Sequence, residues 1–219
     1  PLGAGNILLT TEAGTITVLV GGQGVTTLGT GTITLTAVGG TSDVLVNNVV
    51  TSTTGTIQVN AGRDITTTAI ISATGAGNID LNAVRHIGQG ANITSAGGVI
   101  TADAGTGSIT MTDGTLTSTS GAGTIAYTAA INVAVSQLQT ANTSTVSVTA
   151  TAGAISDNLT AETANITTGT ATLLAALGIG SGAAPADLET DVTTIDARNT
   201  GLTGDIQINE VAAGTAIDV

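Results

Sequence analysis

The sequence of 219 residues contains no cysteine, no tryptophan and no phenylalanine, and its one tyrosine is Tyr127. The lack of cysteine alone fits any cellular compartment. A globular domain of this size usually fills its core with aromatic side chains, because each one buries a large apolar area. Apolar residues still make up 41% of the chain, which is too many for a disordered segment. The sequence therefore predicts an ordered protein with a thin, aliphatic core.

Basic residues are equally scarce. The chain has no lysine and three arginines, Arg63, Arg85 and Arg198, against 15 acidic residues, which gives a formal net charge of −12. A surface of this charge repels phosphate, so we expect neither nucleic acid nor an anionic membrane face as a partner. An acidic, lysine-free and cysteine-free composition favours an extracellular or cell-surface location.

Long hydrophobic runs are also missing. The longest apolar run, "ATLLAALGIG" at 171–180, is too short to cross a bilayer, so we expect no membrane insertion. The first residues, "PLGAGN", show no recognisable signal peptide. A cleaved signal and a longer parent chain both remain open.

A short phrase recurs along most of the sequence: Gly, a small polar residue, Ile, any residue, and an aliphatic residue. Clear copies are "GNILL" at Gly5, "GTITV" at Gly14, "GTITL" at Gly31, "GTIQV" at Gly55, "GNIDL" at Gly77, "GSITM" at Gly107, "GTIAY" at Gly123 and "GDIQI" at Gly204. Successive side chains of a strand alternate between its faces, so Ile and the residue two positions later share one apolar face. Each copy therefore predicts a short strand with an aliphatic inner side.

The spacing of the copies predicts the fold. The phrase containing Ile57 recurs around Ile79, and weaker strand patterns such as "DITTT" and "NITSA" follow the two copies. Three short strands in each such step describe one coil of a parallel β-solenoid, in which like side chains stack at about 4.8 Å. We expect about ten coils of roughly 20–22 residues. Residues 1–219 would form a single β-solenoid, with an irregular loop or bulge around 171–186.

The steps between copies are unequal. The step from Ile33 to Ile57 is clearly longer than the step from Ile109 to Ile125. We interpret the difference as variation in turn length between strands that keep step.

The phrases "GTIQVNAGRDI" and "GNIDLNAVRHI" and the ending "GDIQINEVAAGTAIDV" resemble the repeats of filamentous-haemagglutinin-like exoproteins and of giant bacterial β-strand-repeat surface proteins. The similarity covers most of the chain but includes no catalytic or ligand motif. It implies a right-handed parallel β-helix, secretion, and a role as the stalk of an adhesin or as cell-surface fabric.

Several polar residues recur at equivalent positions. Asn60 and Asn82 occupy equivalent turns, where we expect their amides to stack as a ladder rather than bind a ligand. His86 has no second histidine and no acidic cluster near it in sequence, so a turn residue is favoured over a metal ligand. Tyr127 takes the aliphatic position of "GTIAY", which indicates the core or a wider corner.

Arg63 and Arg85 also fall at equivalent positions. Two stacked arginines repel each other unless Asp64 and neighbouring carboxylates lie between them. We therefore interpret them as a solvated turn with local ion pairs.

An acidic segment follows near the end of the chain. In an extended strand Asp187, Glu189 and Asp191 would share one face, and Asp196 follows. Clustered carboxylates of this kind can hold Ca²⁺. The segment lacks both a glycine-rich calcium repeat and an EF-hand loop, so we favour a solvated acidic edge and leave calcium open.

Four Asn-x-Ser/Thr sequons begin at Asn92, Asn142, Asn158 and Asn165. A chain this rich in Asn, Ser and Thr produces about three by composition alone, so attached glycans stay open.

The functional prediction is a structural one. We expect no enzyme and no cofactor, because one tyrosine and four basic or imidazole side chains are too few for the sites of β-helix lyases and glycoside hydrolases. We expect an extracellular fibre or cell-surface protein whose coils stack end to end, because neither terminal coil carries a recognisable cap. Its partner would then be a copy of itself or neighbouring coils of a longer chain.

Two other functions remain open. The chain could be a stalk segment of a giant secreted adhesin, or an ice-binding solenoid with outward Thr-x-Thr arrays such as "TITLT" at Thr32. The unequal steps between copies argue against the second, because an ice-binding array needs threonines on a regular lattice.

Overall fold

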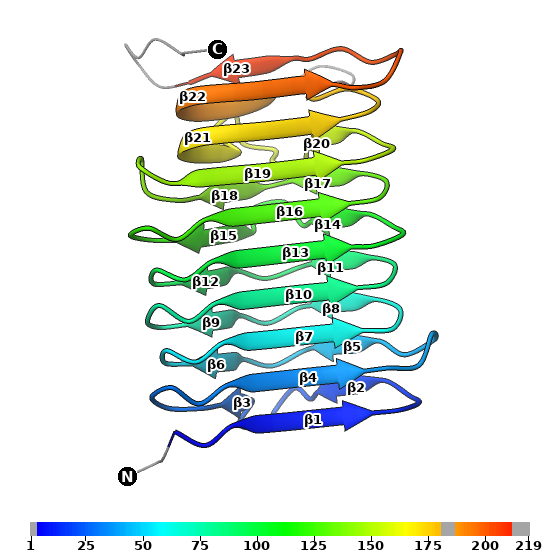
Figure 1. The fold of residues 1–219 in the computed structure, drawn as a ribbon, viewed down its shortest axis with the longest axis vertical. Coiled ribbons are helices and arrows are strands. Elements are labelled where there is room, and N and C mark those ends of the chain that lie inside the picture. The colour runs from blue at the N-terminus through cyan, green and yellow to red at the C-terminus, as the bar shows by residue number, and fades with distance from the viewer. Residues whose placement is uncertain (1–3, 181–186, 212–219) are drawn as a thin grey trace.

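The computed structural model describes residues 4–180 and 187–211 and folds them into one stack of short strands (Figure 1). All 23 elements in these ranges are β-strands, and every pairing between them is parallel. The fold is an all-β, right-handed parallel β-solenoid of about eight turns. The expected fold class is confirmed, whereas the expected ten coils are too many. In the described part of the chain, no helix could span a membrane.

Each coil contributes one strand to each of three faces. The first face contains β1 (Ile7–Thr11), β4 (Ile33–Ala37), β7 (Ile57–Ala61), β10 (Ile79–Ala83), β13 (Ile100–Ala104), β16 (Ile125–Ala129) and β19 (Thr145–Ala150). The second face contains β2 (Ile16–Val18), β5 (Val44–Val46), β8 (Ile65–Thr67), β11 (Ile87–Gln89), β14 (Ile109–Met111), β17 (Val133–Val135) and β20 (Ile155–Asp157). The third face contains β3 (Val25–Thr26), β6 (Val50–Ser52), β9 (Ile71–Ala73), β12 (Ile93–Ser95), β15 (Leu116–Thr119) and β18 (Gln137–Gln139).

The last coils join the third and first faces into long strands. These are β21 (Ile166–Ala175) and β22 (Leu188–Asn199), and β23 (Ile208–Glu210) pairs with the start of β22. The irregular segment expected around 171–186 is therefore regular at its beginning, because 171–175 lie in β21 in register with β19. Residues 181–186 and the final "TAIDV" lie outside the described residues.

Strand register is constant although coil length is not. On the first face Ile7 pairs with Ile33 and Ile79 pairs with Ile100, so the first of these coils contains more residues than the second. The turns absorb the difference, and Ile still lies on Ile in successive coils from β1 to β16. The expected coil of roughly 20–22 residues is too short for most turns of the stack. The chain consequently forms fewer coils than expected.

The repeated phrase marks two faces rather than one. Its copy at Gly55 begins β7 on the first face, whereas its copies at Gly14 and Gly107 begin β2 and β14 on the second. Ile109 accordingly belongs to the second face and Ile125 to the first. The short sequence step between these two isoleucines joins two faces and is not a short coil.

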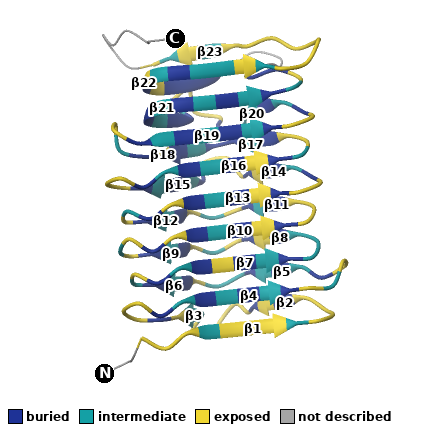
Figure 2. Cartoon of the chain, in the orientation of Figure 1, coloured by how far each residue is buried: buried dark blue, intermediate teal, exposed yellow. Residues whose placement is uncertain are grey.

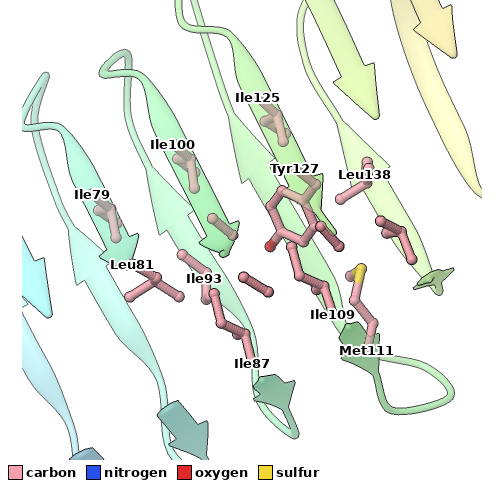
Figure 3. Packing of buried hydrophobic residues seen from close by; sticks show 14 of the residues in the cluster. Ile79, Leu81, Ile87, Ile93, Ile100, Ile109, Met111, Ile125, Tyr127 and Leu138 are labelled. Atoms are coloured by element: carbon pink, nitrogen blue, oxygen red, sulfur yellow. The ribbon is translucent and has the colours of Figure 1, made fainter. Parts of the chain in front are cut away.

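The core consists of stacked aliphatic columns (Figure 3). From β4 to β19, inward residues of the first face, among them Ile57, Ile79 and Ile100, are fully buried and alternate with more exposed positions along each strand (Figure 2). Stacking like on like leaves little irregular space for large rings. The near absence of aromatic residues follows from this packing.

A column of glycines opens the first-face strands. A Cβ atom at Gly77 would lie 2.4 Å from the carbonyl oxygen of Gly55, and one at Gly98 would lie 2.1 Å from that of Gly77. Real Cβ atoms essentially never approach within 3.0 Å. Gly5, in the first coil, would meet nothing within 4 Å. The glycine of the phrase is thus required by the neighbouring coil.

Candidate functional site

A ladder of side chains runs up the corner that precedes the second face. Each member accepts a hydrogen bond from the backbone N–H of the equivalent residue in the following coil, at 2.9–3.5 Å. The members are Thr15, Asp43, Asp64, His86, Ser108 and Asn132. These side chains differ in chemistry, and all they share is a hydrogen-bond acceptor at the same position of the coil. This corner is therefore a structural seam built from several residue types.

His86 is one rung of this seam. Its Nδ1 accepts the backbone N–H of Ser108 at 3.0 Å, and its own backbone N–H donates to Asp64. Because an accepting ring nitrogen carries no proton, the proton of the neutral imidazole lies on Nε2. His86 thus occupies the turn that the sequence predicted for it.

Arg63 and Arg85 stack at the same corner, and each bonds the aspartate of the coil before it. Arg63 donates through Nε and Nη2 to Asp43, and Arg85 donates through the same atoms to Asp64. Asp64 also lies 3.8 Å from Arg63, so a carboxylate stands between the two guanidinium groups. The expected local pairing is confirmed.

These hydrogen bonds change the acidity of both aspartates. The hydrogen bond from Arg63 holds the pKa of Asp43 below its ordinary value, and the one from Arg85 does the same for Asp64. Both carboxylates are consequently charged at neutral pH and serve as anion partners within the seam.

A second ladder follows the outward side of the first face. Asn82 Nδ2 donates to Asn60 Oδ1 at 3.1 Å, and Asn60 Nδ2 donates to Thr36 Oγ1 at 3.2 Å. The expected amide ladder is confirmed, but the two asparagines lie in β7 and β10 and not in turns. A shallow groove of about 490 Å³ runs beside them, and Asp103 and Val84 are among its lining residues.

The outward side of this face bears on ice binding. The unequal spacing of the phrases does not disturb the lattice, because the strands keep register. That part of the sequence argument is wrong. Residue identity still interrupts the array, since the column of Thr34 continues with Gln58 and Asp80.

Tyr127 lies in the core, which is one of the two positions predicted for it; the other is a wider corner. Its hydroxyl group donates to Gln89 Oε1 at 2.6 Å and lies 2.7 Å from Thr117 Oγ1. All three side chains are buried. Burial raises the pKa of Tyr127, so the phenol is neutral. The three side chains thus satisfy one another's polar atoms inside the core.

The acidic segment forms a different cluster from the expected one. Carboxylate oxygens of Glu162, Asp187 and Glu189 lie within 4.8 Å of one another, whereas Asp191 is exposed and outside the group. Glu189 is 1% exposed, so the favoured solvated edge is wrong for this residue. Sequence reasoning missed Glu162, because it lies in the preceding coil and the loop before β21 brings it to the start of β22.

The electrostatics of the cluster are unfavourable as it stands. Burial raises the pKa of Glu189 to about 7, and the negative charges of Asp157, Asp187 and Glu162 act in the same direction. Glu189 Oε2 is buried and finds no hydrogen-bond partner within residues 4–180 and 187–211. The chemistry of the donor set is that of a hard-cation site.

The sequons differ in accessibility. Asn92 and Asn142 are exposed. Asn165 is fully buried, and its side chain bonds Asp157, Ser136 and the backbone N–H of Glu189. A glycan at Asn165 is therefore incompatible with the folded coil.

The chain matches no known family model, no curated protein and no solved structure. The similarity to filamentous-haemagglutinin-like repeats accordingly rests on the repeated phrases alone.

Proposed function

We propose that this chain is a structural rod of an extracellular fibre or cell-surface protein, in which coils continue end to end beyond the described stack. The solenoid supplies a straight rod with a ladder on each face. Most of its polar side chains described above bind other parts of the same stack, which is the arrangement of a scaffold.

The observation that carries the proposal is the open edge of β1. Among the described strands β1 pairs only with β4, and it forms the end of its sheet. Leu8 is 74% exposed and Leu9 is 47% exposed (Figure 2). In a parallel ladder alternate residues bond to opposite sides, and Ile7 bonds toward β4. The N–H and C=O groups of Leu8 and Thr10 therefore point to the open edge.

An edge of this kind is a template for another strand. Leu9 stacks on Leu35 and Val59 and is the exposed end of their column, so the best-fitting occupant is another coil of the same type. The acidic, lysine-free surface and the resemblance to secreted repeat proteins support a location outside the cell.

The alternative function, a stalk segment of a giant adhesin, requires the same stacking of coils. It differs only in the origin of the coil that covers β1. In a stalk, the coil that covers β1 belongs to the same chain; in a fibre, it belongs to another copy.

The test is the assembly state of the chain of 219 residues. We expect sedimentation velocity and negative-stain electron microscopy to show rods that lengthen with protein concentration. Thr10→Pro should keep the rods short, because proline removes an N–H that faces the open edge and leaves the bonds to β4 intact. Thr10→Val, which keeps the N–H, is the matched control.

Monomers at every concentration would refute end-to-end stacking of separate copies. Rods that form equally well with Thr10→Pro would refute the assignment of the edge of β1 as the contact.

A further inference from the structure

The cluster of Glu162, Asp187 and Glu189 is built from two successive coils. Glu162 lies in the loop between β20 and β21, Asp187 immediately precedes β22, and Glu189 is the second residue of β22. The loop is held in place: Thr160 donates through its N–H and its hydroxyl group to the carboxylate of Asp113, and Asn158 Nδ2 donates to the carbonyl oxygen of Met111. The three carboxylates therefore meet without rearrangement of the backbone.

Glu189 supplies an independent sign that something belongs there. Its side chain is 1% exposed, and its Oε2 atom has no hydrogen-bond partner among the described residues. A buried carboxylate oxygen without a partner is costly, because it has lost its hydration without gaining a hydrogen bond. Its immediate neighbours, Glu162 and Asp187, add negative charge.

The chain has no basic side chain to spare for this cluster. It contains no lysine, and its three arginines pair with aspartates elsewhere: Arg63 with Asp43, Arg85 with Asp64 and Arg198 with Asp196. A cation from solution is the remaining way to neutralise the cluster with its carboxylates charged.

We propose that Glu162, Asp187 and Glu189 bind a calcium ion. The donors are carboxylate oxygens, without histidine or cysteine, which suits a hard cation and disfavours zinc or copper. Three carboxylates offer up to six oxygens, and water can fill the remaining positions of the six to eight that calcium takes. Glu162 is exposed, so an ion can enter from its side.

The bound ion would join a loop of one coil to the strand that begins in the next. It would do so where the stack changes from three separate strands per coil to the long strands β21 and β22. Extracellular calcium modules typically have Kd values of about 10⁻⁴–10⁻³ M, and we expect the same range here at the location proposed above.

The experiment is calorimetric titration of metal-free protein with CaCl₂. We expect one ion per chain for the unaltered protein. Glu189→Gln keeps the shape of the side chain and removes its charge, and we expect it to weaken binding at least about tenfold, because calcium affinity follows the number of charged ligands. Asp191→Asn removes the same charge two residues away on the exposed side, and its affinity should stay within about twofold of the unaltered protein.

A second readout is the melting temperature with calcium and with chelator. Calcium should raise it for the unaltered protein and for Asp191→Asn, and should leave Glu189→Gln nearly unchanged. If Glu189→Gln does not fold, Glu162→Gln on the exposed loop replaces it with the same expected loss of affinity.

The proposal is overturned if the unaltered chain takes up no calcium at millimolar concentration. It is also overturned if Asp191→Asn weakens binding as much as the cluster variant does, since calcium would then be attracted only by the general negative charge.

Discussion

Replacing Gly77 with alanine tests whether the glycine column is set by close packing between coils. The added Cβ would lie 2.4 Å from the backbone oxygen of Gly55, well inside the 3.0 Å that real Cβ atoms essentially never cross. The obstacle is backbone and cannot rotate away, so the two coils must move apart at this corner.

The expected magnitude follows from two opposing terms. Forcing an extra group into tight packing costs about 1–3 kcal/mol. The smaller conformational freedom of alanine in the unfolded chain returns about 0.4–1 kcal/mol. Because the obstacle is backbone at 2.4 Å, we take the upper half of the packing cost, about 2–3 kcal/mol, and expect Gly77→Ala to lose about 1–2.6 kcal/mol of unfolding free energy. Gly5→Ala places the same group at the same position of the phrase, where a Cβ meets nothing within 4 Å. It should range from no change to a gain of about 1 kcal/mol.

Urea unfolding followed by far-ultraviolet circular dichroism measures both variants, at a protein concentration low enough to keep the chains separate. Equal losses at Gly5 and Gly77 would show that the turn itself demands glycine. The packing explanation fails as well if Gly77→Ala is as stable as the unaltered protein.

Three further predictions concern the core and the seam. Ile79→Asp should unfold its coil locally, because it buries an unpaired charge, and faster hydrogen exchange of the β10 amides would show this. The outward Thr34→Ser should change the unfolding free energy by less than about 0.5 kcal/mol. Similar damage from both variants would contradict the assignment of inward and outward positions. Tyr127→Phe should cost about 1–2 kcal/mol in urea unfolding, since Gln89 Oε1 loses its shortest hydrogen bond in the core. The pKa of Asp64 is lowered in the folded state, so its contribution is present above the unfolded pKa of about 3.9 and is lost as the pH falls through the folded value. Asp64→Asn should therefore flatten the decline of the urea midpoint between about pH 5 and pH 2, and an unchanged decline would refute the pairing.

The repeats made the fold predictable because they reveal the strand and its inward side. "GTIQV" and "GNIDL" align Ile57 with Ile79 and Val59 with Leu81, and the structure pairs these residues in β7 and β10. The number of coils could not be read in the same way. The phrase at Gly107 has the same pattern as first-face copies but begins a second-face strand, because an inward Ile and a tight corner are needed on both faces.

The sites were harder to predict than the fold. The amide ladder of Asn60 and Asn82 was visible, since identical residues repeat at one coil interval. The seam was not, because His86 and Ser108 perform one task with different chemistry. Glu162 was missed for a third reason: the path of the loop before β21, and not the register of a strand, brings it to Glu189.

The direction of the ladders has a mechanical consequence. The chain winds around the rod, whereas the hydrogen bonds between coils run along it, and the first and last described strands, β1 and β23, lie at opposite ends of the stack (Figure 1). A pulling force on those ends would act along the hydrogen bonds between coils and break them one row at a time. Each folded coil occupies about 4.8 Å of the rod, but a released coil can extend to about 80 Å. Under tension such a rod would lengthen in steps, and the unfolding of each coil would dissipate mechanical work before the chain breaks.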